Sequence, residues 1–296
     1  ASTFSTASAY IADITPPQQR AQKFAILGAA FGAGFVMGPA VGGILGDVDV
    51  RYPFYCGALL AAANTLFGAL FVKESLPQDR RRAFSWARAN TLGTLLRLLR
   101  TPGVKILLPV FFLATLSSWV YPTVWSYVAK ARFQWSEGDI GLSIAYYGVI
   151  AFLAQAVVVQ VVMPRMRLQT VIWIALLVEV LALVGIGTAR AGWVVYAMVT
   201  TALVSTMQDP AIRQELSSRA PQDAQGELQG GLSALTSLAM ILSPVIYNGL
   251  FTLTAGETPL IDFPGSPFVV AAAMSALALV FYALRTPRAE PAGHNA

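Results

Sequence analysis

Long apolar runs constrain this chain more than any other feature. Eight complete runs of roughly 18 residues or more, each enough to cross ~30 Å of hydrocarbon as a helix, follow one another. They cover residues 24–46, 52–72, 104–128, 140–163, 170–189, 192–212, 228–251 and 267–284, and residues 1–14 read as the end of a ninth. Lipid cannot hydrogen-bond the backbone, so runs of this length without alternation predict helices rather than barrel strands. We predict an all-α polytopic membrane protein.

The scarcity of polar chemistry excludes most enzymes. Charged residues make up 12% of the chain, about half the share in soluble domains. One cysteine, Cys56, and one histidine, His294, leave no disulfide framework, no CxxC motif, no histidine zinc site and no Ser-His-Asp triad. A membrane enzyme would need a His, Asp or Cys cluster at a membrane edge, and the sequence has none. We expect no enzyme activity, no metal site and no cofactor.

The basic residues report topology rather than a nucleic-acid partner. The net charge is +5, but the positive side chains lie between apolar runs instead of on a soluble module. Sixteen of the 20 Lys and Arg residues fall in alternate connections, which the positive-inside rule places in the cytoplasm. The first segment would then start outside, residues 255–266 would face outward, and the carboxyl terminus would be cytoplasmic in an inner (plasma) membrane. Because the chain begins outside at Ala1 without a signal peptide, we expect an amino-terminally truncated protein.

The longest connection predicts a boundary between two halves. It contains the tract 80–82, and its residues 91–100 place leucines on one face flanked by arginines, which is typical of an interfacial helix. A merely solvated basic loop is the alternative. We predict an amino-terminal helix bundle over 1–72, a cytoplasmic connection over 73–103, a carboxy-terminal six-helix bundle over 104–285 and a cytoplasmic tail over 286–296.

A repeat supports that boundary. Pro16 and Pro39 recur as Pro221 and Pro244, both with an offset of 205, inside segments of similar order and polarity. Internal repeats of this kind are the architecture of secondary transporters, whose substrate site lies between the halves near the membrane midplane.

Glycines are concentrated in the run at 24–46. Glycine at four-residue spacing lets a neighbouring helix approach closely, and Pro39 provides a flexible point. Tight helix packing without a role in gating is the alternative. The pattern consists of Gly34, Gly38, Pro39, Gly42 and Gly43.

This pattern resembles the antiporter signature of the fifth helix in drug:proton antiporters of the major facilitator superfamily. AYIADIT at 9–15, FQWSEGDIGLSIAYYG at 133–148, LAQA at 153–156 and GELQGGLSALTSL at 226–238 are similar to the tetracycline-resistance branch. The resemblance implies a twelve-helix fold, of which this chain would hold about nine, from a truncated fourth to the twelfth. Asp13 and Arg20 resemble the branch's gating loop after the fourth helix, with helix capping and topology as the alternative roles.

Glu179 is the acid in the middle of an apolar run. A charge there costs roughly 2.5–3.5 kcal/mol, so an intramembrane acid is a functional candidate. Its helix carries no basic residue to pair with it, and proton exchange is the role we expect. The position coincides with an acid in the ninth helix of the tetracycline antiporters. A protonated or water-exposed bystander is the alternative. Ala151 departs from the branch, which tends to carry a histidine there, so a different substrate is also open.

Further polar and aromatic residues in the runs are candidates for a substrate-lining surface. Serine and threonine hydroxyls in membrane helices often bond their own i−4 carbonyl or a neighbouring helix instead, and the aromatic residues also fit an aromatic belt at the membrane surface. The candidates are Asn64, Trp119, Tyr121, Trp125, Gln155, Ser233, Thr236, Ser237 and Met240.

The sequence thus predicts a proton-coupled efflux carrier for a drug-like, amphipathic small molecule, tetracycline-like by resemblance. We expect a monomer in the lipid bilayer, driven by the proton gradient, with any metal arriving chelated by the substrate. A carrier of the same fold for an endogenous metabolite and an inactive truncated relic are the alternatives.

Overall fold

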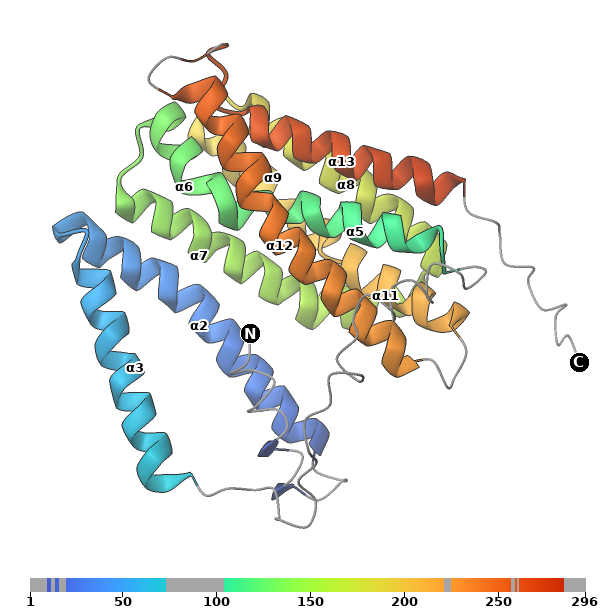
Figure 1. The fold of residues 1–296 in the computed structure, drawn as a ribbon, viewed down its shortest axis with the longest axis horizontal. Helices are drawn as coiled ribbons and strands as arrows, with labels where there is room; N and C mark the ends of the chain where they lie inside the picture. The colour runs from blue at the N-terminus through green and yellow to red at the C-terminus, as the bar shows by residue number, and fades with distance from the viewer. Residues whose placement is uncertain are drawn as a thin grey trace, which may run out of the picture. The chain divides into compact units, whose positions relative to one another are not determined.

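A computed structural model describes residues 10–11, 14–15, 20–72, 104–220, 225–256, 259 and 261–284, and its regular elements in these ranges are all helical (Figure 1). This confirms the predicted all-α class. The predicted connection at 73–103, with its interfacial helix, and the tail at 286–296 lie outside these ranges. The helices are α2 (Arg20–Val48), α3 (Tyr52–Phe71), α5 (Leu107–Ser118), α6 (Val120–Phe133), α7 (Glu137–Leu153), the π-helix η4 (Ala154–Val162), the 3-10 helix η5 (Met163–Arg165), α8 (Leu168–Thr188), α9 (Gly192–Thr200), α10 (Ala202–Ser205), α11 (Gln208–Arg219), α12 (Gln225–Ala255) and α13 (Ser266–Ala283).

Six helical stretches in the described ranges are long and apolar enough to cross a membrane. The run at 192–212 is not among them, because it is divided into α9, α10 and the start of α11. In α2, the apolar stretch Gly32–Val48 is shorter than the six. Those six are Tyr52–Phe71, Leu107–Phe133, Glu137–Val162, Leu168–Thr188, Leu228–Ala255 and Ser266–Ala283.

Contacts divide the chain into two compact units. The first comprises Ala1–Arg88 with Trp135–Phe152, and the second comprises Ala89–Gln134 with Leu153–Ala296. Helix α7, which follows the predicted inter-half connection, thus belongs with α2 and α3, which precede it. The predicted bundles at 1–72 and 104–285 stay a prediction.

In the first unit, short turns set the helix starts. The α2–α3 turn is closed by the backbone N–H of Arg51, which donates to Asp49 Oδ1 at 2.8 Å, and Pro53 lies in the first turn of α3, where a proline costs no hydrogen bond. A reciprocal capping box starts α7: the backbone N–H of Asp139 donates to the Ser136 hydroxyl, and that of Ser136 donates to Asp139 Oδ2, each at 3.1 Å.

The core of the second unit lies where α13 packs against α5 and α8. Since lipid tails are as apolar as leucine, close packing and interhelical hydrogen bonds, rather than exclusion of water, hold such helices together. Two bonds reach from buried side chains to α5 and α13: the Ser117 hydroxyl donates to the Ala271 carbonyl, and the Tyr247 hydroxyl to the Leu116 carbonyl, each at 2.8 Å.

The repeated prolines occupy matching places. Pro39 lies inside α2 and Pro244 inside α12, which are helices of 29 and 31 residues. The helix that follows each of them has a proline in its first turn, Pro53 in α3 and Pro267 in α13.

Candidate functional site

Glu179 lies near the middle of α8 and is 3% exposed. Helix α8 packs against α13, α10, α11 and α9. The Ser205 hydroxyl, in α10 and itself 4% exposed, is the hydrogen-bond partner of the Glu179 carboxyl. The structure therefore places the carboxyl group inside the second unit, beside a serine hydroxyl and with no ion-pair partner among the described residues. A carboxyl group in such a setting can bind or release a proton, because no described neighbouring charge fixes its protonation state.

The segment that carries Ser205 is a broken helix. Helix α9 ends at Thr200, α10 covers four residues and α11 starts at Gln208. Threonine hydroxyls bond the local backbone at both breaks: Thr201 Oγ1 donates to the Met198 carbonyl at 2.5 Å, and Thr206 Oγ1 to the Ala202 carbonyl at 2.7 Å. Discontinuous membrane helices often mark binding sites, because irregular backbone is tolerated where it lines a cavity or is covered by protein.

Gln208 extends this polar region toward α5. Its Nε2 donates to the Ser118 hydroxyl at 3.0 Å, and the side chain is 7% exposed. Its Oε1 has no hydrogen-bond partner among the described residues. The sequence shows Gln208 as one polar residue in an apolar run, and its burial beside the break became visible only in the structure.

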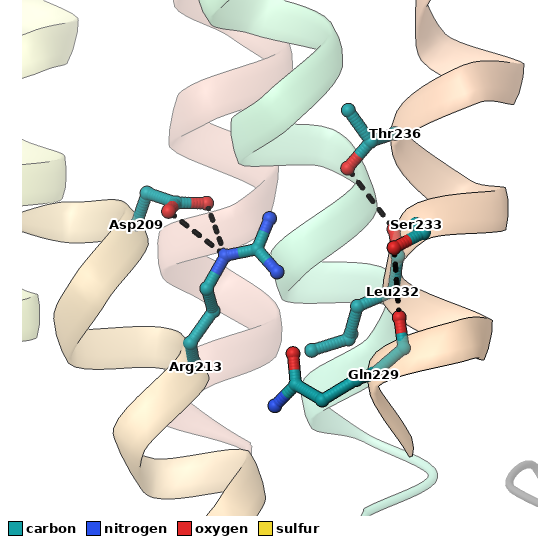
Figure 2. Close-up of polar contacts among 6 residues, drawn as sticks. All are labelled: Asp209, Arg213, Gln229, Leu232, Ser233 and Thr236. Carbon is teal, nitrogen blue, oxygen red and sulfur yellow. Dashed lines mark hydrogen bonds and ion pairs between the residues drawn. The ribbon is translucent and has the colours of Figure 1, made fainter. Parts of the chain in front are cut away.

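The candidates Ser233, Thr236 and Ser237 lie on α12, and Figure 2 shows Ser233 and Thr236. Ser233 and Ser237 are exposed, Thr236 is half-buried and Met240 is 43% exposed. Their hydroxyl protons bond the carbonyls one turn earlier, with distances of 2.9, 3.0 and 3.0 Å for Ser233, Thr236 and Ser237. These hydroxyl groups can therefore contact other molecules mainly as hydrogen-bond acceptors.

Two of the aromatic candidates, Tyr121 and Trp125, contact α13. Tyr121 and Trp125 both meet the Phe268 ring edge to face, with ring centroids 5.5 and 6.1 Å apart. Trp125 is buried, whereas Trp119, at the α5–α6 junction, is half-buried. Such pairs contribute about 0.5–1.5 kcal/mol beyond burial, so Tyr121 and Trp125 hold α6 on α13.

One glycine of the predicted antiporter motif meets another helix backbone. A Cβ on Gly43 would lie 2.7 Å from the Glu137 carbonyl oxygen and 2.9 Å from Gly141 Cα, closer than real Cβ atoms approach. A Cβ on Gly34, Gly38 or Gly42 would meet no atom within 4 Å among the described residues. Gly43 and Gly141 therefore form the crossing point of α2 and α7.

Asp47 strengthens this crossing one turn further along α2. Its Oδ1 accepts from the backbone N–H of Gly138 at 2.8 Å, and its Oδ2 lies 3.5 Å from the Ser136 hydroxyl. The carboxylate thus caps the start of α7 across the helix interface, where the helix dipole favours a negative charge. The sequence places Asp47 after the motif, but only the structure pairs it with α7.

The remaining predicted residues lie apart from these groups. Asn64 in α3 and Gln155 in η4 are exposed, and Ala151 in α7 is half-buried. Asp13 lies outside the described residues, and Arg20 is described only as the first residue of α2. No group of three or more His, Cys, Asp or Glu side chains that could hold a metal occurs within the described ranges.

Arg213, one of the basic residues in the predicted cytoplasmic set of connections, forms an ion pair on α11. Arg213 Nε donates to both carboxylate oxygens of Asp209, at 3.0 and 2.8 Å (Figure 2). The four-residue spacing of an acid and an arginine on one helix was the signal that could have revealed it.

A bundle of apolar helices with an internal repeat, a broken helix and a buried carboxyl group defines the class of secondary membrane transporters. The family model of the Major Facilitator Superfamily matches residues 1–244. The chain belongs to this superfamily. This match confirms the predicted partial major facilitator fold. It also confirms the prediction of a transporter rather than an enzyme.

Tetracycline resistance proteins are among the most similar relatives. The class C protein of Escherichia coli is 34% identical over 282 residues, which cover 92% of this chain and 67% of that protein. The class G protein of Vibrio anguillarum is 32% identical over 261 residues, which cover 86% and 64%. These matches confirm the resemblance to the tetracycline-resistance branch, and the chain spans about two thirds of the length of these relatives.

A solved structure shares the fold. The human organic anion transporter MFSD10 (TETRAN) matches with a TM-score of 0.62 and 23% identity, covering 94% of this chain and 67% of that one.

Proposed function

We propose that this chain acts as a proton-coupled efflux carrier for an amphipathic, tetracycline-like small molecule in the inner membrane, with a cytoplasmic carboxyl terminus. Superfamily membership supports transport, and similarity to tetracycline resistance proteins supports a substrate of this kind. The carrier works as a monomer, exchanges substrate for protons and uses no cofactor.

The buried carboxyl group of Glu179 carries the proposal. In an apolar helix its charged form costs roughly 2.5–3.5 kcal/mol, so the proton is released where water or a substrate charge reaches the site. Proton binding and release at Glu179 then bias the two access states, because a ligand shifts an equilibrium between states that bind it differently. Ser205 orients the carboxyl group as a positioning residue.

Transport in inverted membrane vesicles tests this proposal. Glu179→Gln keeps the size and hydrogen bonding of the side chain but cannot release a proton, so uphill substrate transport should fall at least tenfold at equal protein levels. Glu179→Asp keeps a titratable group and should retain part of the rate. Asp262→Asn, at an exposed acid outside the helices, is the matched control and should transport like the unaltered chain.

A full rate with Glu179→Gln would overturn the role of this carboxyl group. Comparison of tetracycline with a panel of metabolites in the same vesicles addresses the endogenous-metabolite alternative that Ala151 leaves open. Transport of a metabolite but not of tetracycline would replace the substrate assignment and leave the coupling mechanism in place.

A further inference from the structure

We infer that Arg213 recognises a negatively charged, two-oxygen group of the transported molecule, at the place where α11 faces α12. The inference rests on the proposed transport function and adds the chemical class of the substrate: an amphipathic molecule that bears a carboxylate or a similar pair of oxygen atoms sharing one negative charge.

The guanidinium group of Arg213 is held on two sides. Its Nε donates to both carboxylate oxygens of Asp209, at 3.0 and 2.8 Å. Its central carbon lies 4.7 Å from the centre of the Phe111 ring of α5, within cation–π distance. Because the pair and the ring together fix the plane of the group, little side-chain entropy remains to be lost when a ligand binds.

The remaining donors of Arg213 are available. The two terminal nitrogens make no hydrogen bond to other groups in the part of the chain that the structure describes, and the side chain is 32% exposed. Figure 2 shows the side chains of Arg213 and Gln229 extending from α11 and α12 toward one another. Two parallel N–H groups of a guanidinium match the two oxygens of a carboxylate, which makes this end of Arg213 an anion-binding fork.

Helix α12 offers the complementary chemistry. The hydroxyl protons of Ser233 and Thr236 are committed to the carbonyls of Gln229 and Leu232, at 2.9 and 3.0 Å. Their oxygens can still accept hydrogen bonds. A molecule with an anionic group for Arg213 and hydroxyl or amide donors for α12 would satisfy both faces.

The Asp209–Arg213 pair should contribute little to the stability of the protein. The two side chains are 54% and 32% exposed, and exposed ion pairs typically contribute about 0–1 kcal/mol. In a chain with so few charges, a pair that orients an arginine toward α12 fits a recognition role better than a structural one.

Equilibrium binding to the purified full chain in lipid nanodiscs tests the inference. The probes are 2-naphthoxyacetate and its uncharged primary amide, followed by quenching of tryptophan fluorescence. The unaltered chain should bind the carboxylate about five- to tenfold more tightly than the amide. Arg213→Gln should abolish this preference while leaving the affinity for the amide within about twofold.

Two further variants keep the outcome clear. Arg167→Gln, at an exposed arginine in the link to α8, should keep the preference, and Arg213→Lys, which retains charge but not the fork, should keep part of it. Equal affinity for the two probes, absence of saturable binding, or a preference that survives in Arg213→Gln would overturn the inference. This assay reads the preference between two probes, whereas the vesicle assay reads transport driven by a proton gradient, so failure of the coupling mechanism would not be mistaken for failure of this site.

Discussion

Two glycines show how single atoms decide where helices meet in this protein. At Gly43 the α2 backbone approaches that of α7 so closely that a methyl group would contact the Glu137 carbonyl oxygen and Gly141. The neighbouring Gly42 has the same side chain and belongs to the same motif, but its Cβ position is open. Residues that look equivalent in the sequence therefore have different roles in packing.

Substituting these two glycines should have opposite effects. Gly43→Ala should lower the free energy of unfolding of the purified protein by about 1–3 kcal/mol, the usual cost of forcing an extra group into a packed contact. Gly42→Ala should leave stability unchanged or raise it by up to about 1 kcal/mol, since alanine is the better helix former. Thermal unfolding in one detergent, followed by circular dichroism, compares them. Equal destabilisation by both substitutions would contradict the proposed crossing point.

The residue scale also sets the limit of sequence analysis. A lone acid in an apolar run is conspicuous, so Glu179 could be predicted as a candidate before its burial and its bond to Ser205 were known. The choice of Gly43 from five motif positions needs the location of a second helix, which no spacing within α2 provides. Arg213 directly follows the apolar run at 192–212, so the sequence predicts a charge in a connection, whereas the structure places it inside α11.

At the scale of whole elements, apolar length predicted helices well and their interruptions poorly. All eight complete runs fall on helices, but the run at 192–212 is broken at Thr201 and again before Gln208. Neither break contains glycine or proline. Threonine hydroxyls that bond nearby carbonyls compete with the regular helix, and tertiary packing decides whether they interrupt it. Another irregularity, the π-helix η4, has no strong sequence signal, although such segments frequently accompany function.

The carboxy-terminal half of α11 is joined to α13 by a buried hydrogen bond. The Tyr282 hydroxyl donates to Glu215 Oε2 at 2.6 Å, and Glu215 Oε1 accepts from Arg219 at 2.5 Å. Both the tyrosine and the glutamate are buried. Hydrogen bonds to charged groups contribute about 1.5–3 kcal/mol, so this contact fixes one helix of the second unit on another.

Removing one oxygen atom tests this contact. Tyr282→Phe should destabilise the protein by about 1.5–3 kcal/mol, because the buried carboxylate loses a donor. Tyr127→Phe is the matched control: Tyr127 is 57% exposed, and its hydroxyl makes no hydrogen bond among the described residues. Thermal unfolding measures both variants. A Tyr282→Phe protein as stable as the control would show that α11 and α13 are held by packing alone.

At the scale of the whole molecule, the order of the segments along the chain does not match the units into which they pack. Sequence order separates α2 and α3 from everything after residue 103, but α7 packs with them in the first unit. The α2–α7 contact therefore joins segments on opposite sides of the predicted boundary between halves.

The topology can be tested independently of transport. In a Cys56→Ser background, Asp262→Cys should react with an impermeant maleimide added to intact cells, because the positive-inside rule places residues 255–266 outside. Gln169→Cys, in the first turn of α8 just after the link that carries Arg165 and Arg167, should react only after the membrane is permeabilised. Both positions are exposed in the structure. Labelling of Gln169→Cys in intact cells would reverse the proposed orientation.

The most direct test of the proposed function is proton movement caused by the substrate. Inverted vesicles that contain the chain are energised to an acidic interior, and acridine orange fluorescence reports the pH gradient while tetracycline is added. Proton-coupled exchange predicts that tetracycline dissipates the gradient in vesicles with the unaltered chain, and does so at least tenfold more slowly with Glu179→Gln. If tetracycline leaves the gradient unchanged in vesicles where it is accumulated, the chain transports without proton exchange and the central claim is wrong.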